Sequence, residues 1–205
     1  RELGLSGTAA GMLTTLPVLC FGAISPLAPL LARRFGLDAT LLLAVTAIAT
    51  GSIVRMGQPV ALLYLGTFTI GAGIALLNVL IPAFVKREAP SRVGMMTSLY
   101  TMLLNAGAAT GSALTVPVMN ATGWSWRPAL GIWTIPAVVA IGAMLPWVAH
   151  QRRNGTATPG FARRRGLWNS AVAWQLTIAM GTQSMVFFSV AAWLPTMLQD
   201  AGMSE

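Results

Sequence analysis

The chain of 205 residues is poor in the groups on which most soluble proteins and enzymes depend. It contains one cysteine, one histidine and five acidic residues, and charged residues make up only 9% of it. A single cysteine excludes a disulfide framework, and without clustered Cys, His and acidic residues we expect no metal and no cofactor. The middle of every apolar run also lacks Asp, Glu, Lys and Arg, the residues of a proton relay or a carboxylate pair. We therefore predict no catalytic residues and no enzyme activity.

Apolar sequence, in contrast, is abundant. Hydrophobic residues make up 55% of the chain, and the mean hydropathy is +0.70. Polar segments divide it into six apolar runs, each close to the length of about 20 residues that crosses a bilayer as a helix. The predicted fold is an all-α membrane protein, a polytopic bundle of transmembrane helices at residues 8–31, 38–54, 60–85, 93–119, 128–148 and 167–198.

Prolines and capping residues refine the first two spans. Pro17, Pro26 and Pro29 lie inside the first span or at its end. Proline removes a backbone donor, and membrane helices accommodate it by bending, so we predict a bent first span. Ser6 and Asp38 precede apolar runs and are residue types that cap helix N-termini, so both are predicted N-caps.

Basic residues fall almost entirely in alternate polar segments. Ten of the thirteen lie in the second, fourth and sixth segments, namely Arg33, Arg34, Lys86, Arg87, Arg92, Arg152, Arg153, Arg163, Arg164 and Arg165. Because cytoplasmic loops collect Lys and Arg, this pattern predicts a multi-pass protein of the inner (plasma) membrane, with these three segments in the cytoplasm and the lipid bilayer as partner. The net charge of +8 does not indicate a nucleic-acid partner, because the charges occupy short loops beside apolar runs.

The longest polar segment, residues 149–166, marks a predicted domain boundary. It is basic and contains Asn154-Gly155 and Pro159-Gly160, a composition typical of a flexible linker. The prediction is an N-terminal bundle of five transmembrane helices over residues 1–148, a cytoplasmic linker over 149–166, and the first helix of a C-terminal bundle within 167–205.

Neutral polar residues provide the candidate binding site. Amides at membrane depth either line a water-filled cavity, where they hydrogen-bond a small polar solute, or link neighbouring helices. Both interpretations remain open for the amides, whereas a hydroxyl group readily bonds a carbonyl of its own helix. The candidate substrate-binding residues are Asn78, Asn105, Gln183, Thr14, Thr15 and Tyr100.

Two local patterns predict helix contacts. Thr14 and Thr15 precede Pro17, and bonding of the carbonyl freed by that proline is their favoured role. Gly107 and Gly111 form a GxxxG pair, which predicts close packing of the fourth span against another helix.

With spans and loops assigned, the sequence resembles the major facilitator superfamily, and within it the cyanate/2-nitroimidazole porter branch. The resemblance rests on residues 2–6, 13–22, 26–29, 32–36, 73–82, 86–87 and 193–195. It covers essentially the whole chain, which would correspond to helices two to seven of a twelve-helix fold. It implies that the rest of the same polypeptide, the first helix and the remaining C-terminal bundle, is a partner of this chain.

The segment after the first span resembles the gating loop of that superfamily. Arg34, Phe35 and Gly36 match its pattern, so the resemblance implies a gating role for Arg33, Arg34 and Gly36. Pro29 stands where the loop usually has glycine, and Arg33 where it usually has aspartate. The charge-relay role of that aspartate therefore does not carry over.

The function implied by the resemblance is secondary active transport of a small polar or anionic solute, cyanate- or nitroimidazole-like, by alternating access. An efflux permease for drugs or metabolites in the same superfamily is the alternative. From another class, a multi-span membrane sensor or assembly subunit is the alternative. A transporter should continue into five more spans, whereas a sensor should continue into a soluble output domain.

Overall fold

A computed structural model describes residues 7–153, 171, 174–175, 177–179 and 181–184. The chain divides into two compact units, residues 1–161 and 162–205. Described residues of the second unit are helical. The first unit holds the helix bundle.

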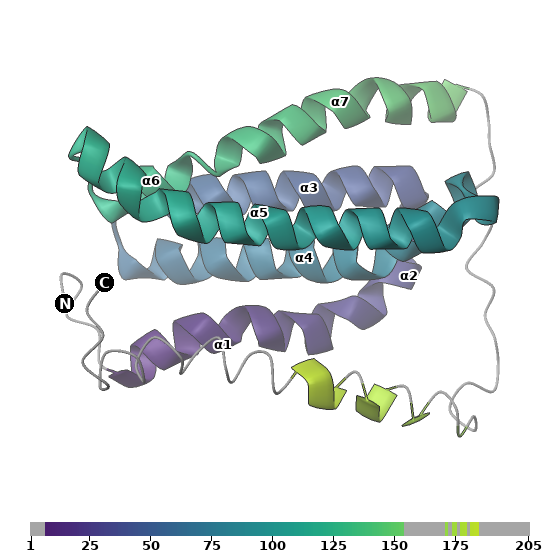
Figure 1. Ribbon diagram of the computed structural model, residues 1–205, viewed down its shortest axis with the longest axis horizontal. Coiled ribbons are helices and arrows are strands. Elements are labelled where there is room, and N and C mark those ends of the chain that lie inside the picture. Colours follow the sequence, from purple (N-terminus) through teal and green to yellow (C-terminus); the bar gives the residue numbers. More distant parts are fainter. Residues whose placement is uncertain (1–6, 154–170, 172–173, 176, 180, 185–205) are drawn as a thin grey trace. The chain divides into compact units, whose positions relative to one another are not determined.

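The first unit is built from helices joined by short turns (Figure 1). Long apolar runs form them because a helix satisfies its own backbone donors and acceptors, as a lipid environment requires. In chain order the elements are α1 Gly7–Ile24, η1 Ser25–Leu27, α2 Ala28–Phe35, α3 Leu37–Val54, α4 Val60–Glu88, η2 Pro90–Arg92, α5 Val93–Thr122, α6 Trp126–Gly131 and α7 Thr134–Arg153.

Five of the six predicted spans are found within the described residues. By length and composition, the helices at Gly11–Phe35, Leu37–Val54, Val60–Glu88, Pro90–Thr122 and Pro128–Gln151 can each cross a membrane. Most of the sixth predicted span, 167–198, lies outside the described residues. At the predicted boundary, α7 continues to Arg153, so residues 149–153 of the predicted linker are helical; residues 154–166 are not described.

The predicted bend in the first span is confirmed. A 3₁₀ turn at Ser25–Leu27, with Pro26 in its first turn, separates α1 from α2. Gly36 then joins α2 to α3 at a φ of 88°, a left-handed conformation that favours glycine. The predicted cap at Asp38 is wrong: α3 begins at Leu37, Gly36 occupies the N-cap position, and Asp38 bonds side chains of other helices. Ser6 lies outside the described residues.

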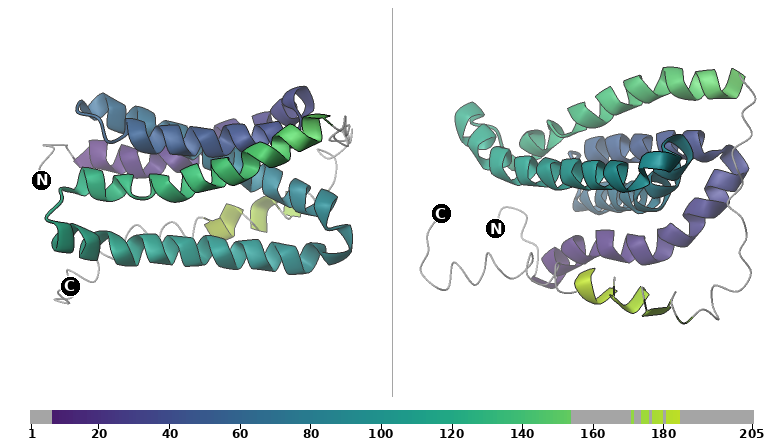
Figure 2. Two further views of the ribbon diagram at one scale, coloured as in Figure 1. Left: turned by 90° about the horizontal axis from the view of Figure 1, so that it is seen from above. Right: turned by 45° about the vertical axis from the view of Figure 1, so that its right-hand side comes forward.

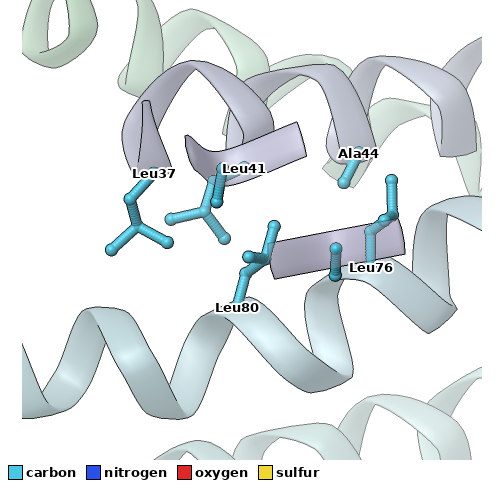
Figure 3. Packing of buried hydrophobic residues seen from close by; sticks show 7 residues of the cluster. Leu37, Leu41, Ala44, Leu76 and Leu80 are labelled. Atoms are coloured by element: carbon cyan, nitrogen blue, oxygen red, sulfur yellow. The ribbon is translucent and has the colours of Figure 1, made fainter. Parts of the chain in front are cut away.

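The core lies where α2, α3 and α4 meet. Ala28, Ala32, Leu37, Leu41, Ala44, Leu76 and Leu80 form one buried cluster, most of which Figure 3 labels. Glycines let the backbones of α3 and α4 touch: a Cβ added at Gly66 would lie 2.6 Å from the backbone oxygen of Gly51, and one at Gly73 would lie 2.7 Å from that of Ala44. Close approach at small residues is how helices associate in lipid.

The α5 helix is packed very differently. It contains no buried residue, whereas α3 and α4 each contain several. Figure 2 shows it along one side of the α3/α4 pair. A Cβ added at Gly107 or Gly111 would meet nothing within 4 Å among the described residues. Within the described part of the chain no helix packs against this GxxxG pair, so its packing role stays a prediction.

Candidate functional site

The predicted amides of the first unit lie on exposed helix surfaces. Asn78 on α4 and Asn105 on α5 are both exposed. Asn105 donates from Nδ2 to the carbonyl of Thr101, one turn earlier, over 2.9 Å, which leaves its amide oxygen available. Within the described residues of this unit, neither amide bonds a side chain of another helix, so neither acts there as a link between helices.

The predicted hydroxyl residues behave as intrahelical donors. The Thr15 hydroxyl donates to the carbonyls of Gly11 and Met12 at 3.1 and 3.2 Å. The carbonyl freed by Pro17 belongs to Leu13, so the predicted partner for Thr15 is wrong. Tyr100 is half-buried on α5, and Thr14 lies on α1, where its side chain is outside the description. Gln183 is an exposed residue of the second unit, and its position relative to the amides of the first unit is not defined.

The predicted gating residues lie at one end of the bundle. Arg33 and Arg34 form the exposed last turn of α2, where cations interact favourably with the C-terminal end of the helix dipole. The Arg34 guanidinium carbon lies 5.5 Å from the ring centre of Phe35. Gly36 accepts hydrogen bonds from both the backbone N–H and the hydroxyl of Thr40, at 3.1 and 2.7 Å. Together these contacts fix a one-residue connection between α2 and α3.

An ion pair at the same end of the bundle joins helices that are far apart in sequence. Arg87, near the end of α4, donates from both terminal nitrogens to the two carboxylate oxygens of Asp38 on α3, one of these bonds measuring 2.9 Å. Its Nε donates to Glu88 at 2.6 Å. Trp147 on α7 donates from Nε1 to Asp38 at 3.2 Å. We call Asp38, Arg87 and Trp147 the three-helix brace.

Sequence reasoning missed the brace because its members are distant in the chain. Asp38 and Arg87 are 49 residues apart, and Asp38 and Trp147 are 109 apart. The one available signal is Asp38 at the start of a predicted span, where the residue type also predicts a helix cap. An aspartate that begins an apolar span also predicts an ionic partner, because an unpaired charge there is costly.

The opposite end of the bundle contains two buried polar atoms without partners. Arg55 Nε, at the end of α3, and the Thr134 hydroxyl, at the start of α7, are buried and make no hydrogen bond among the described residues. Burial lowers the pKa of the Arg55 guanidinium, because the charged form loses hydration.

The chemistry available to these residues is hydrogen bonding and charge pairing. Within the described part of the chain, no group of three or more His, Cys, Asp or Glu could hold a metal ion. Neutral amides on exposed faces can bind a polar solute through both donors and acceptors. The charged groups lie near helix ends. Asp38 and Arg87 pair with each other, and Arg55 Nε has no partner among the described residues.

Comparison with known proteins places these features in a family. The profile of the Major Facilitator Superfamily matches residues 1–205. The chain is 39% identical over 201 residues to a 2-nitroimidazole transporter of Escherichia coli (strain K12), a match covering 98% of this chain and 51% of that protein. It is also 39% identical over 202 residues to the uncharacterized transporter YycB of Bacillus subtilis (strain 168), covering 98% and 50%.

A third relative extends the comparison to cyanate. The chain is 27% identical over 202 residues to the cyanate transport protein CynX of Escherichia coli (strain K12), covering 98% of this chain and 52% of that protein. The chain thus spans about half the length of these curated relatives. No solved structure gave a significant match. The predicted family is therefore confirmed: this multi-pass membrane chain belongs to the major facilitator superfamily.

Proposed function

We propose that this chain is about half of a secondary active transporter that moves a small polar or anionic solute, cyanate- or nitroimidazole-like, by alternating access. The observation that carries the proposal is the 39% identity to a 2-nitroimidazole transporter along 98% of the chain. The weaker similarity to a cyanate transport protein extends the solute class to small anions. Transport requires the rest of the polypeptide, because alternating access needs two bundles that rock about a shared site.

Asn78 and Asn105 are the proposed solute-facing residues of the first unit. Both are exposed, and Asn105 keeps a free amide oxygen after bonding its own helix. Neutral amides suit a compact solute that both donates and accepts hydrogen bonds. Gln183, Thr14, Thr15 and Tyr100 complete the proposed set, with hydrogen bonding and shape selection as their role.

The membrane and the orientation are part of the proposal. We place the protein in the inner membrane, with the basic end of the bundle and residues 149–166 in the cytoplasm. Residues 1–148 then form the N-terminal bundle, and residues 167–205 contain the first C-terminal helix. The 29 residues of α4 support a full crossing, because at 1.5 Å per residue it is about 43 Å long, against a hydrocarbon core of about 30 Å.

Thiol labelling tests this orientation. Gln58 and Ser91 are exposed and lie beyond opposite ends of α4, so each is replaced by cysteine in a Cys20→Ala background of the full-length protein. A membrane-impermeant maleimide should label Gln58→Cys in intact cells and Ser91→Cys only in inverted vesicles. Labelling of both positions from one side would refute the proposed threading.

Solute uptake tests the function itself. Vesicles containing the full-length protein should accumulate labelled 2-nitroimidazole or cyanate, and right-side-out and inverted vesicles should differ in direction. Asn78→Leu and Asn105→Leu should each lower the initial uptake rate about tenfold or more, the effect of losing one hydrogen bond to the solute in an enclosed site. Asn120→Leu is the matched control, since Asn120 is an exposed asparagine near the outer end of α5. Normal uptake by both test variants, with normal membrane abundance, would reject the assignment of the amides.

A further inference from the structure

We propose that Asp38 and Arg87 are positioning residues for transport, which hold the start of α3 and the ends of α4 and α7 together as one rigid body. The inference rests on the proposed transport function and extends it to residues that do not touch the solute. It comes from the geometry of the three-helix brace, which joins three helices through one carboxylate.

The Arg87 guanidinium is fully oriented by its neighbours. Its Nε donates to Glu88, and its two terminal nitrogens donate to the two oxygens of Asp38. The guanidinium carbon lies 5.2 Å from the ring centre of Phe84, one turn earlier on α4. A bidentate carboxylate pair over an aromatic face has one preferred geometry, so it fixes orientation as well as distance.

Trp147 brings the third helix into the same cluster. Its indole N–H reaches Asp38 on α3, while its ring meets Phe84 on α4 edge to face, with ring centres 6.5 Å apart. A single α7 side chain thus contacts both other helices. Rotation or sliding of α7 relative to α3 and α4 would break a hydrogen bond and an aromatic contact together.

Partial burial makes the ion pair effective. The Arg87 and Asp38 side chains are only 17% and 12% exposed. Water therefore competes weakly for these charges, and separating them would leave each one poorly solvated. The apolar cluster beneath packs by van der Waals contact without a hydrophobic driving force, because lipid tails are as apolar as leucine. The brace adds a charge pair and hydrogen bonds that a slipped arrangement of the three helices would lose.

The α5 helix lies outside the brace. It follows α4 after the short η2 turn, and none of the three brace residues belongs to it. We infer that α3, α4 and α7 keep their arrangement when the transporter changes state. Neutralising Asp38 should therefore slow the conformational step and leave solute binding unchanged.

Accessibility of a core cysteine tests the brace without requiring transport. Leu41 is 5% exposed and lies one turn beyond Asp38 on α3, so Leu41→Cys in a Cys20→Ala background of the full-length protein reports opening of this end. Asp38→Asn keeps an oxygen for Trp147 but removes the charge. It should raise the N-ethylmaleimide labelling rate about tenfold, as expected from the loss of a charged hydrogen bond that restrains local opening.

Charge reversal and a matched control sharpen the test. The double variant Asp38→Arg/Arg87→Asp should label within about twofold of the parent, because the pair is restored with its polarity exchanged. Glu88→Gln is the control, since Glu88 is 34% exposed and bonds only the Nε of Arg87. Parental labelling of Asp38→Asn, or equal labelling of Asp38→Asn and Glu88→Gln, would overturn the proposal.

Uptake kinetics distinguish the loss of the brace from a loss of solute binding. With 2-nitroimidazole as the probe, Asp38→Asn should lower the maximal rate about tenfold and leave the half-saturating concentration unchanged. A raised half-saturating concentration with a normal maximal rate would overturn the positioning role. If the parent protein moves neither 2-nitroimidazole nor cyanate while Asp38→Asn still labels rapidly, the proposed function fails and the brace stands.

Discussion

The α3/α4 pair and α5 are both long, apolar and rich in small residues, yet only the pair forms a core. In α3 and α4, glycines stand where backbones meet: a Cβ at Gly51 would lie 2.7 Å from the Gly66 oxygen, and one at Gly71 would lie 3.0 Å from the Cα of Pro17. In α5, added Cβ atoms at Gly107 and Gly111 meet nothing among the described residues. The same residue type therefore marks a contact in one region and an unoccupied surface in the other.

The difference shows which helix contacts form within a chain that spans about half the length of its relatives. Several residues of α3 and α4 are buried inside the first unit, whereas α5 has no buried residue among those described. Since the chain spans about half of its relatives, the proposed C-terminal bundle is a candidate partner for the glycines of α5. Three pairs of substitutions and one single substitution test this comparison, and they are ordered from the largest expected effect to the smallest.

The largest contrast is expected between Gly66→Ala and Gly107→Ala. At Gly66 the new methyl group would lie 2.6 Å from the backbone nitrogen of Arg55, so we expect a loss of about 2 to 3 kcal/mol from overpacking. At Gly107 it meets open space, and alanine's better helix propensity should stabilise by up to about 1 kcal/mol. Unfolding of the first unit, residues 1–161, in detergent micelles measures both. If Gly107→Ala is destabilising only in the full-length protein, a helix outside residues 1–161 covers this part of α5.

Removing the indole N–H of Trp147 should have the next largest effect. Trp147→Phe keeps an aromatic ring against Phe84 but loses the hydrogen bond to Asp38. Because the acceptor is charged, we expect a loss of about 1.5 kcal/mol in the same unfolding assay. The comparison variant is Trp124→Phe, whose parent side chain is 46% exposed beyond the end of α5. Equal losses in the two variants would show that the Asp38 bond contributes nothing.

A smaller effect is expected at the contact that holds α5 to the rest of the unit. Trp133, between α6 and α7, donates from Nε1 to the Thr115 hydroxyl on α5 over 3.1 Å. Trp133→Phe should cost about 1 kcal/mol, the usual contribution of a neutral hydrogen bond. Hydrogen exchange should show faster opening of the outer half of α5 with little change in α3. Equal acceleration of hydrogen exchange in α5 and α3 would mean that this hydrogen bond does not hold α5 independently of the rest of the bundle.

The smallest effect is expected for a threonine on α5. Thr101 and Thr40 both donate to the carbonyl four residues earlier, at 2.8 and 2.7 Å, but Thr101 is exposed and Thr40 is fully buried. Thr101→Val should change the unfolding free energy by less than about 0.5 kcal/mol. Thr40→Val should cost about 1 kcal/mol, because its partner lies at the tight turn of Gly36. A larger loss at Thr101 would reverse the proposed difference between the two regions.

Sequence patterns predicted the membrane elements well. The spans predicted at 38–54 and 60–85 correspond to α3 Leu37–Val54 and α4 Val60–Glu88, and the prolines of the first span correctly predicted its bend. Charge alternation agrees with the bundle, since the ends of α2, α4 and α7 all lie toward the right-hand end of the bundle in Figure 1. These features are local, so a short window of sequence contains the physics that decides them.

The predictions that failed concern partners. Aspartate is a residue type common at helix N-caps, yet the Asp38 carboxylate binds Arg87 and Trp147 instead. Thr15 bonds carbonyls of its own turn, not the one freed by Pro17. Gly107 and Gly111 have the spacing of a packing motif but no neighbour among the described residues, so that contact stays a prediction. In each case the residue type was informative, but several partners were available and the sequence did not rank them.

The sequence by itself determined that this chain has repeated helices able to cross a membrane, roughly where five of them lie, and which polar segments collect positive charge. It did so because a backbone in lipid must satisfy its own hydrogen bonds, which leaves the helix as the form of each apolar run. Only the tertiary structure decided that Asp38 pairs with Arg87, that Gly66 and Gly73 are contact points, and that the described residues bury no part of α5. Those choices depend on the rotation and register of one helix against another, which arise from packing between segments distant in the chain.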